Sequence, residues 1–363
     1  MRSLIDIHDL SVGELDELLA TASDILAQPD KYAEACRRKK LATLFFEPST
    51  RTRLSFEAAM LELGGSVIGF SDADSSSASK GESVSDTARV ISAYADIIAM
   101  RHPKEGAALV AAAGATVPVI NAGDGGHAHP TQTLTDLFTI LREHGRLSGL
   151  TVGFCGDLKY GRTVHSLIAA LSRYTDIRIV LISPEELALP GYIKGGVLDE
   201  CGMPYIETDD LERFLPELDV LYMTRIQRER FPDPSEYERL KDSYILTPEK
   251  LTAAKESLAI LHPLPRVNEI SVRVDADPRA CYFRQVENGK IVRKALILKL
   301  LREAEADPTP IAMPGEPREE YVCQNPVCIT TKEQELLPRF RVANREMGIV
   351  RCVFCEKRAL PRK

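Results

Sequence analysis

The chain has 363 residues, of which 44% are hydrophobic and 27% charged, and its formal net charge is −7. These values are ordinary for a folded globular protein, and the acidic balance argues against nucleic acid as the main partner. No apolar run approaches the roughly 20 residues that span a bilayer, and the N-terminus lacks the apolar core of a signal peptide. We therefore expect no membrane segment and a cytoplasmic location.

The first part of the chain alternates helix-like and strand-like segments. Helical spacing of apolar residues is found at 12–26, 55–63, 84–94 and 131–143. Strand-like apolar runs are found at 41–46, 66–70, 96–101 and 117–122. Alternation of this kind predicts an α/β domain with a parallel sheet, which we place at residues 1–147.

The same pattern restarts in the second part of the chain. Strand-like runs are found at 151–155, 177–182, 203–206, 220–223 and 258–261, with a helix at 163–174. We therefore predict a second doubly wound domain at residues 148–285. An amphipathic pattern at 291–305 predicts a helix that returns to the first domain, and we assign it residues 286–305.

The C-terminal part has a different character. Residues 307–317 hold four prolines in eleven positions, which is typical of an extended linker, here assigned to 306–318. Residues 319–363 then form a small module. The predicted fold class is α/β, with two doubly wound parallel-sheet domains and a small C-terminal β-rich module.

The segment 46–53 carries the first candidate site. It ends a predicted strand at Pro48 and continues with hydroxyl and guanidinium side chains. Ser49 stands at the N-cap of the following helix, so the next backbone N–H groups and two arginines face whatever lies in front of that helix. This favours a phosphate site, although an ordinary capped helix with solvent-facing arginines explains the segment alone equally well.

Polar side chains also stand where other predicted strands end. The carboxyl ends of parallel strands meet at one edge of a sheet, where ligands bind. His129 and Gln132 are three residues apart at a predicted helix start, so both can face one pocket. The candidates of this kind are Arg101, His129, Gln132, Arg162, Arg225 and Gln227.

Two further segments have a chemical character of their own. The serine-dense stretch 71–82 predicts a mobile loop that brings a hydroxyl and Lys80 onto a bound anion, with a disordered linker as the alternative. The segment 262–266 is rich in proline, which cannot donate, so its backbone carbonyls are available to accept hydrogen bonds.

The turn at 156–162 lacks the spacing of a dinucleotide-binding loop, and no acidic residue ends the next strand. Both observations argue against a nucleotide cofactor at this turn.

Taken together, these segments resemble a known family. Segments 46–53, 129–132 and 262–266 resemble the signatures of the aspartate/ornithine carbamoyltransferases, and the resemblance extends over about residues 1–305.

The aspartate branch is the better match. Segments 156–165 and 223–227 resemble that branch. An ornithine enzyme is expected to have cysteine in place of Pro263 and a Ser-Met-Gly segment, and neither is present.

The resemblance implies transfer of the carbamoyl group of carbamoyl phosphate to the α-amino group of L-aspartate, in pyrimidine biosynthesis. The alternative is a carbamoyltransferase for another amino acid, such as ornithine or a derivative. The residues implied to bind carbamoyl phosphate are Ser49, Thr50, Arg51, Thr52, Ser76, Arg101, His129, Gln132, Leu264 and Pro265. Those implied to bind aspartate are Lys80, Arg162, Arg225 and Gln227. Those implied to be catalytic are Arg51, Thr52, Arg101 and His129.

The resemblance also implies a homotrimer in which Ser76 and Lys80 reach the site of a neighbouring subunit. We expect no cofactor in the active site, because the substrate amine attacks directly and catalysis reduces to orientation and charge stabilisation. A zinc-binding regulator that has lost activity is a non-enzyme alternative. Against it, every motif position holds a chemically competent residue.

Four cysteines are concentrated near the C-terminus. Cys323 and Cys328 are separated by four residues, Cys352 and Cys355 by two, and 23 residues lie between the pairs. Two such pairs can form a closed tetrahedral cage for one structural Zn²⁺ per chain.

The cysteine module resembles the zinc domain of the regulatory chain of aspartate carbamoyltransferase, here fused to a catalytic chain. The nucleotide-binding domain of that regulatory chain has no counterpart, so we expect a role in subunit contact. The other cysteines, expected to be buried free thiols, are Cys36, Cys155, Cys201 and Cys281.

Overall fold

The computed structural model describes residues 1–73, 77–226, 233–331, 333, 336–344 and 348–362. The chain divides into two compact units. Unit 1 comprises Met1–Thr131 and Lys290–Lys363, and unit 2 comprises Gln132–Gly289. None of the described helices is both long enough and apolar enough to cross a membrane.

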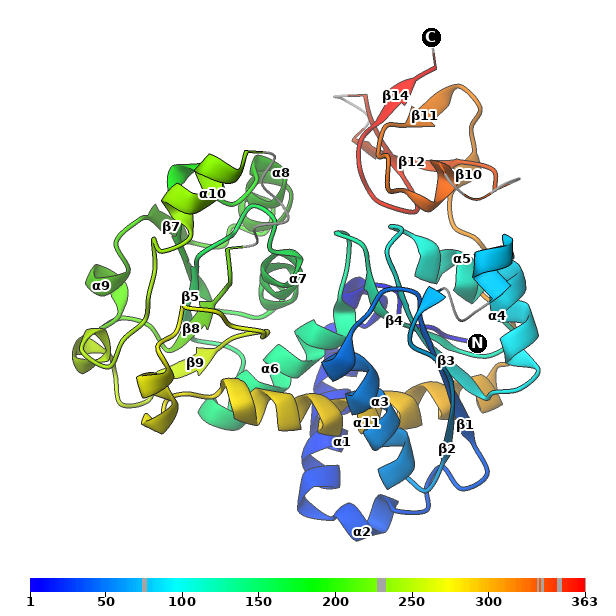
Figure 1. The fold of residues 1–363 in the computed structure, drawn as a ribbon, viewed down its shortest axis with the longest axis horizontal. Helices are drawn as coiled ribbons and strands as arrows, with labels where there is room; N and C mark the ends of the chain where they lie inside the picture. The colour runs from blue at the N-terminus through cyan, green and yellow to red at the C-terminus, as the bar shows by residue number, and fades with distance from the viewer. Residues whose placement is uncertain (74–76, 227–232, 332, 334–335, 345–347, 363) are drawn as a thin grey trace. The chain divides into compact units, whose positions relative to one another are not determined.

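Unit 1 is built on a four-stranded parallel sheet with the strand order β2-β1-β3-β4 (Figure 1). Its strands are β1 (Lys40–Phe45), β2 (Ser66–Phe70), β3 (Ile97–His102) and β4 (Val119–Asp124). Strands β1, β3 and β4 are buried along almost their whole length, as expected for parallel strands covered on both faces. The predicted α/β class is therefore confirmed for this unit.

The helices of unit 1 follow the predicted order with two additions, the short helix α2 (Pro29–Tyr32) and the helix α5 (Ala107–Gly114). The others are α1 (Val12–Ala27), α3 (Thr50–Glu62) and α4 (Val84–Ser92), with short 3-10 turns η1 (Ile7–Asp9) and η3 (Ser77–Lys80). Helix α3 packs on β1 and β2, and α5 packs on β3 and β4. The sequence did not predict α5, because its run of small apolar residues has no polar face and so no helical period.

Unit 2 is built on a five-stranded parallel sheet with the order β7-β6-β5-β8-β9. Its strands are β5 (Thr151–Cys155), β6 (Arg178–Ile182), β7 (Tyr205–Thr208), β8 (Val220–Met223) and β9 (Ala259–Leu261). Its helical segments are α7 (Arg162–Leu171), η4 (Glu185–Leu187), α8 (Gly191–Ile193), η5 (Lys194–Asp199), α9 (Leu211–Phe214), α10 (Pro234–Leu240), η7 (Lys250–Ala253) and η8 (Val272–Ala276).

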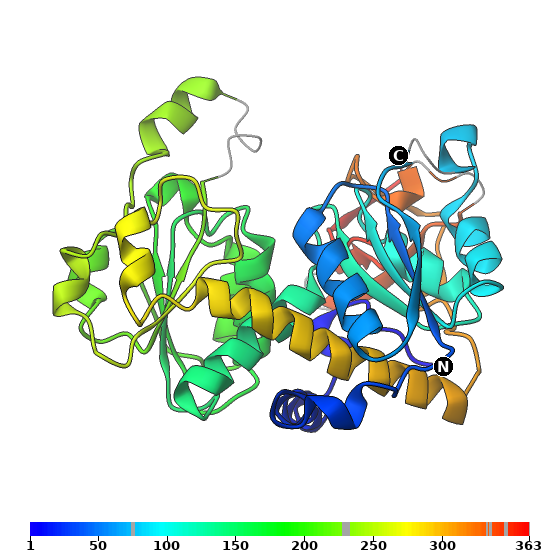
Figure 2. The same cartoon turned by 60° about the horizontal axis from the view of Figure 1, so that its bottom comes forward.

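Two long helices carry the chain from one unit to the other. They are α6 (Pro130–His144) and α11 (Tyr282–Ala306), the latter drawn as the long gold helix in Figure 2. Helix α11 begins four residues before its assigned start at position 286 and nine residues before the amphipathic pattern at 291.

The C-terminal module is β-rich, as predicted. Its strands are β10 (Glu316–Pro317), β11 (Tyr321–Cys323), β12 (Arg339–Asn344), β13 (Ile349–Cys352) and β14 (Ala359–Pro361), with the turn η9 (Ile329–Thr331). They form one antiparallel sheet, β10-β12-β13, and one pair, β11-β14.

The module shares its apolar core with the rest of unit 1. Phe354 and Ile329 belong to the same buried cluster as residues of β1, β3 and α5. The close approach requires a glycine at position 106, which has a φ of +88° and where an added Cβ would lie 2.5 Å from the Cβ of Phe354. The module is thus packed against its own chain, a contact that the sequence did not predict.

One expectation about the cysteines is wrong. Cys201 is exposed, whereas Cys36, Cys155 and Cys281 are buried as expected. Burial raises the pKa of the Cys36 thiol to about 11 and that of the Cys281 thiol to about 12, so these thiols remain protonated and inert at neutral pH.

Candidate active site and metal centre

The N-terminus of α3 lies directly after β1, as the sequence predicted. Ser49 occupies the N-cap, but its side chain makes no capping hydrogen bond. Thr50, Arg51 and Thr52 form the first turn, which contains no acidic residue. The positive end of the helix dipole is therefore not neutralised locally, and the backbone N–H groups of this turn suit an anion.

Arg51 and Arg101 bring two guanidinium groups to the same region of unit 1. The pKa of Arg51 is lowered, first by partial burial and then by the positive charge of Arg101. Arg101 is the penultimate residue of β3, is paired in register with Phe45 at the end of β1, and its side chain is only 13% exposed. Its Nε lies 3.2 Å from Oε2 of Glu47, which compensates one of the two charges. The remaining positive charge favours an anionic ligand.

His129 is positioned by the loop that follows β4. It is buried, and its Nδ1 lies 3.4 Å from Oγ1 of Thr131. Asp124, at the end of β4, accepts hydrogen bonds from the backbone N–H of Ala128 at 3.0 Å and of Gly106 at 2.7 Å. Because β4 pairs with β3 in parallel, Arg101 near the end of β3 and His129 after β4 both belong to the same edge of the sheet.

Three predicted residues belong to exposed or undescribed segments. Lys80 is described and exposed at the end of η3. Ser76 and Gln227 lie outside the described residues.

In unit 2, Arg162 and Arg225 follow neighbouring strands of the sheet. Arg162 is the first residue of α7, after β5, and Arg225 follows β8, which pairs with β5. The two strand ends approach closely: an added Cβ at Gly156, where φ is +114°, would lie 2.5 Å from the carbonyl oxygen of Thr224. Both arginine side chains are half-buried. Forked guanidinium groups placed in this way suit carboxylates.

The loop after β9 carries Leu264 and Pro265 and is held by internal hydrogen bonds. The N–H of Leu264, whose φ is +54°, donates to Nδ1 of His262 at 2.8 Å. Nε2 of His262 lies 2.7 Å from Oε1 of Glu269. A leucine in the left-handed region costs about 1–3 kcal/mol, and these bonds fix it there.

Glu269 is a residue of this loop that the sequence analysis missed. Its Oε2 accepts hydrogen bonds from the backbone N–H of Val267 at 3.0 Å and of Asn268 at 3.1 Å. Burial alone would raise the pKa of Glu269, but the hydrogen bond from His262 and those from the loop amides lower it below its ordinary value. The sequence contains no signal for Glu269, because in a loop the spacing between two residues does not indicate that they are in contact.

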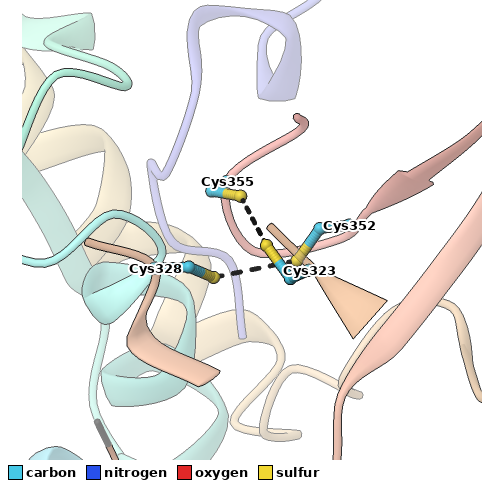
Figure 3. Close-up of side chains that lie close together, drawn as sticks. All are labelled: Cys323, Cys328, Cys352 and Cys355. Atoms are coloured by element: carbon cyan, nitrogen blue, oxygen red, sulfur yellow. Dashed lines mark hydrogen bonds between the residues drawn. The ribbon is translucent and has the colours of Figure 1, made fainter. Parts of the chain in front are cut away.

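The four C-terminal cysteines converge on one point. Their Sγ atoms all lie within 4.8 Å of one another and all four residues are buried. The side chains point toward a common centre (Figure 3), with 3.5 Å between the sulfurs of Cys323 and Cys355 and 3.8 Å between those of Cys328 and Cys352. The predicted set of four is thus brought together.

Comparison with protein families accounts for nearly the whole chain. Residues 2–142 match the carbamoyl phosphate-binding domain of aspartate/ornithine carbamoyltransferases, and residues 148–300 match their aspartate/ornithine-binding domain. Residues 321–360 match the metal-binding domain of the aspartate carbamoyltransferase regulatory chain. The chain belongs to the aspartate/ornithine carbamoyltransferase family.

Individual relatives lie on the aspartate side of that family. The chain is 64% identical over 301 residues to the aspartate carbamoyltransferase catalytic subunit of Lachnoclostridium phytofermentans, covering 83% of this chain and 98% of the relative. It is 62% identical over 300 residues to that of Clostridium acetobutylicum, with the same coverage.

Solved structures agree with the sequence relatives. The catalytic subunit of M. jannaschii aspartate transcarbamoylase superposes with a TM-score of 0.79 at 49% identity, covering 85% of this chain and 100% of that one. The Trypanosoma cruzi aspartate transcarbamoylase in complex with carbamoyl phosphate and aspartate superposes with a TM-score of 0.77 at 37% identity, covering 82% and 96%. The family resemblance inferred from the sequence is therefore confirmed.

Proposed function

We propose that this protein is an aspartate carbamoyltransferase. It transfers the carbamoyl group of carbamoyl phosphate to the α-amino group of L-aspartate and releases N-carbamoyl-L-aspartate and phosphate, a step of de novo UMP synthesis. The observation that carries the proposal is the first turn of α3, where an uncompensated helix dipole stands beside Arg51 and Arg101. Its relatives are named as aspartate carbamoyltransferases or aspartate transcarbamoylases, which favours aspartate over ornithine as the amino acid that is carbamoylated.

The phosphate end of the site lies at α3. Ser49, Thr50, Arg51 and Thr52 bind the phosphate through backbone N–H groups, hydroxyls and one guanidinium group. Ser76 joins them from a neighbouring subunit.

The carbamoyl group is polarised and oriented by side chains that follow the sheet. Thr52, Arg101 and His129 donate to the carbonyl oxygen, on which negative charge grows as the tetrahedral intermediate forms. Gln132 and the backbone carbonyls near Leu264 and Pro265 accept from the carbamoyl NH₂. Fixed donors of this kind stabilise the charge without reorganising, and one donor is typically worth about 10²–10³-fold in turnover.

The amino acid is bound by cations. Arg162 and Arg225, with Gln227, hold the two carboxylates, and Lys80 of a neighbouring subunit adds a charge. The free amine attacks the carbamoyl carbon, the bond to the phosphate oxygen breaks, and the amine proton passes to the departing phosphate. This sequence of steps requires no cofactor in the active site.

The acceptor specificity is tested directly with the purified protein. Carbamoyl phosphate is supplied with L-aspartate, L-ornithine or N-acetyl-L-ornithine, and the carbamoylated products are measured. We expect product with aspartate alone. Comparable turnover of ornithine or its derivative would contradict the proposal, and absence of turnover with every amine would favour a regulator without activity.

The assembly that we propose is a homotrimer with shared sites. The resemblance to the family implies that Ser76 and Lys80 reach the site of the adjacent subunit. Mixing inactive Arg51→Ala and Lys80→Ala chains under conditions of subunit exchange should then restore part of the activity, since one site in some mixed trimers is intact. Proven exchange without recovery would exclude shared sites.

The domain roles follow from the same proposal. Residues 1–147 bind carbamoyl phosphate, 148–285 bind aspartate, 286–305 form the returning helix, 306–318 the linker and 319–363 the metal module. A cytoplasmic location is proposed because cysteine thiols and a thiolate metal site suit a reducing compartment.

The metal that we propose for the cysteine cluster is one structural Zn²⁺ per chain. A tetrahedral zinc with bonds of about 2.3 Å to sulfur requires sulfurs about 3.8 Å apart. The separations of 3.5 and 3.8 Å fit this requirement. Four protein ligands leave no open position, so the metal would supply folding energy and take no part in the reaction. Metal analysis of the purified protein by mass spectrometry tests its identity and stoichiometry.

A further inference from the structure

A buried carboxylate in unit 2 connects several of the elements that hold the substrates. Asp136 lies on α6, four residues after Gln132, and it is fully buried. Its Oδ1 accepts from Nε2 of Gln132 at 2.7 Å and from Nε2 of Gln285 at 2.6 Å. Its Oδ2 accepts from the hydroxyl of Tyr222 at 3.0 Å. Three neutral donors from three elements thus converge on one side chain.

The hydrogen bonds to Asp136 fix the orientation of the side-chain amides of Gln132 and Gln285. An ionised carboxylate can only accept hydrogen bonds, whereas a glutamine amide has a donating NH₂ and an accepting oxygen. Because Gln132 directs its NH₂ at Asp136, its Oε1 is the atom left to face a ligand. A carbamoyl NH₂ needs an acceptor there, and a reversed amide would meet it with a second NH₂.

The same carboxylate also anchors the loop that supplies the other acceptors. Gln285 donates to Asp136, and its Oε1 accepts the backbone N–H of His262 at 3.0 Å. His262 in turn holds the N–H of Leu264. The position of the 262–265 backbone, whose carbonyls are proposed to bind the carbamoyl NH₂, therefore depends on Asp136 through one intermediate side chain.

Tyr222 completes the arrangement on the side of β8. Burial and then the charge of Asp136 raise the pKa of Tyr222 well above its ordinary value, so its hydroxyl stays protonated and donates. The hydroxyl also interacts with Thr163, which follows Arg162 at the start of α7. The network thus extends to the two elements that carry the proposed carboxylate-binding arginines.

We propose that Asp136 is a positioning residue that makes the site selective for the amino group of the carbamoyl donor, by orienting both sets of NH₂ acceptors. The inference rests on the proposed function, since it concerns the same site. Acetyl phosphate is the matched probe, because it has a methyl group where carbamoyl phosphate has the amino group. Selectivity is the ratio of the two dissociation constants, measured by calorimetry without aspartate.

Asp136→Ala is the principal variant. Its Gln132 amide can rotate and its 262–265 loop is released, so we expect the affinity for carbamoyl phosphate to fall at least about tenfold while that for acetyl phosphate changes little. Parallel loss of both affinities would overturn the proposal, because it would signal a general packing defect. An unchanged ratio would overturn it as well.

Asp136→Asn provides the conservative rescue. The single oxygen of asparagine can accept from both glutamines, and the Tyr222 hydroxyl can turn to accept from the new NH₂. We expect the ratio to return to within about threefold of wild type. A ratio as low as in Asp136→Ala would overturn the assigned hydrogen-bond pattern.

Thr139→Val is the matched structural control. Thr139 lies one turn further along α6, is fully buried, and accepts from Nδ2 of Asn288 on α11 at 3.0 Å. Its loss should lower the melting temperature and leave the ratio unchanged. A shift in the ratio as large as that of Asp136→Ala would contradict a specific role for Asp136.

If Asp136→Ala does not fold, Gln285→Leu is the variant that tests the proposal. It frees the His262 loop and leaves the Gln132 bond in place, so we expect about half of the logarithmic loss in ratio, and no loss would overturn the proposal. Failure of the proposed function is distinguished by the wild type. A wild-type protein that forms no N-carbamoyl-L-aspartate refutes that function, whereas an active wild type with unchanged variants refutes only the role of Asp136.

Discussion

The α/β part of the chain and the cysteine module obtain their order in different ways. The two sheets are surrounded by helices and hold many fully buried aliphatic and aromatic side chains. The module has few such residues of its own, and its buried centre is four thiols together with side chains that it shares with α5. In the α/β part, binding groups can be removed without loss of the core. In the module, the proposed ligands are themselves part of the core.

Metal removal is expected to have the largest effect, because it should affect the cysteine module and leave the α/β part folded. Chelation, or Cys328→Ser, should unfold residues 319–363 while the sheets persist, because structural zinc contributes about 10–16 kcal/mol of binding energy to such folds. Hydrogen exchange compared between the module and β1–β4 measures the difference. Cys201→Ser is the control, since this thiol is exposed and lies outside the cluster. Full metal content in Cys328→Ser would exclude the four-cysteine cage.

Arg51→Ala tests whether a binding group of the α/β part can be removed without loss of the core. It removes one guanidinium group from the phosphate site, and we expect kcat/KM to fall about 10²–10³-fold with an almost unchanged melting temperature. Arg53→Ala is a matched control on the same turn, because its Nη1 lies 3.6 Å from Oε1 of Glu57 and its charge is already compensated. Equal losses in both variants would show that the general positive charge of the turn matters, and not Arg51 itself.

The sequence predicted the two parallel sheets well for a physical reason. Parallel strands collect their carboxyl ends at one edge, so Arg101, near the end of β3, and His129, in the loop after β4, could be placed toward that edge. The N-cap position of Ser49 was predicted for a similar local reason, but its unused hydroxyl was not. The docking of the module could not be predicted, because Glu105 and Asn325 are 220 positions apart and no periodicity records such a contact.

The contact between the cysteine module and the α/β part of unit 1 is tested at Glu105. This residue is 3% exposed, and its Oε2 accepts from Nδ2 of Asn325 at 2.6 Å. Glu105→Ala leaves that donor without its acceptor in a buried place, which should cost about 1–3 kcal/mol of unfolding free energy. Glu105→Gln keeps an accepting oxygen and should cost less. Module exchange rates that do not respond to Glu105→Ala would mean that the shared apolar cluster alone holds the joint.

The smallest expected effect is a change of unfolding free energy with pH, and it depends on Glu269 in unit 2. The pKa of Glu269 is lowered in the folded protein, so its stabilisation is present above the ordinary glutamate pKa and is lost as the pH falls through the lowered value. Glu269→Gln should therefore unfold about 1–2 kcal/mol more easily than wild type at pH 7, and the difference should shrink as the pH falls below the ordinary glutamate pKa and through the lowered value. Denaturant unfolding of both proteins across this pH range measures it. A constant difference at all pH values would show that the shape of the side chain stabilises the 262–269 loop, and not its charge.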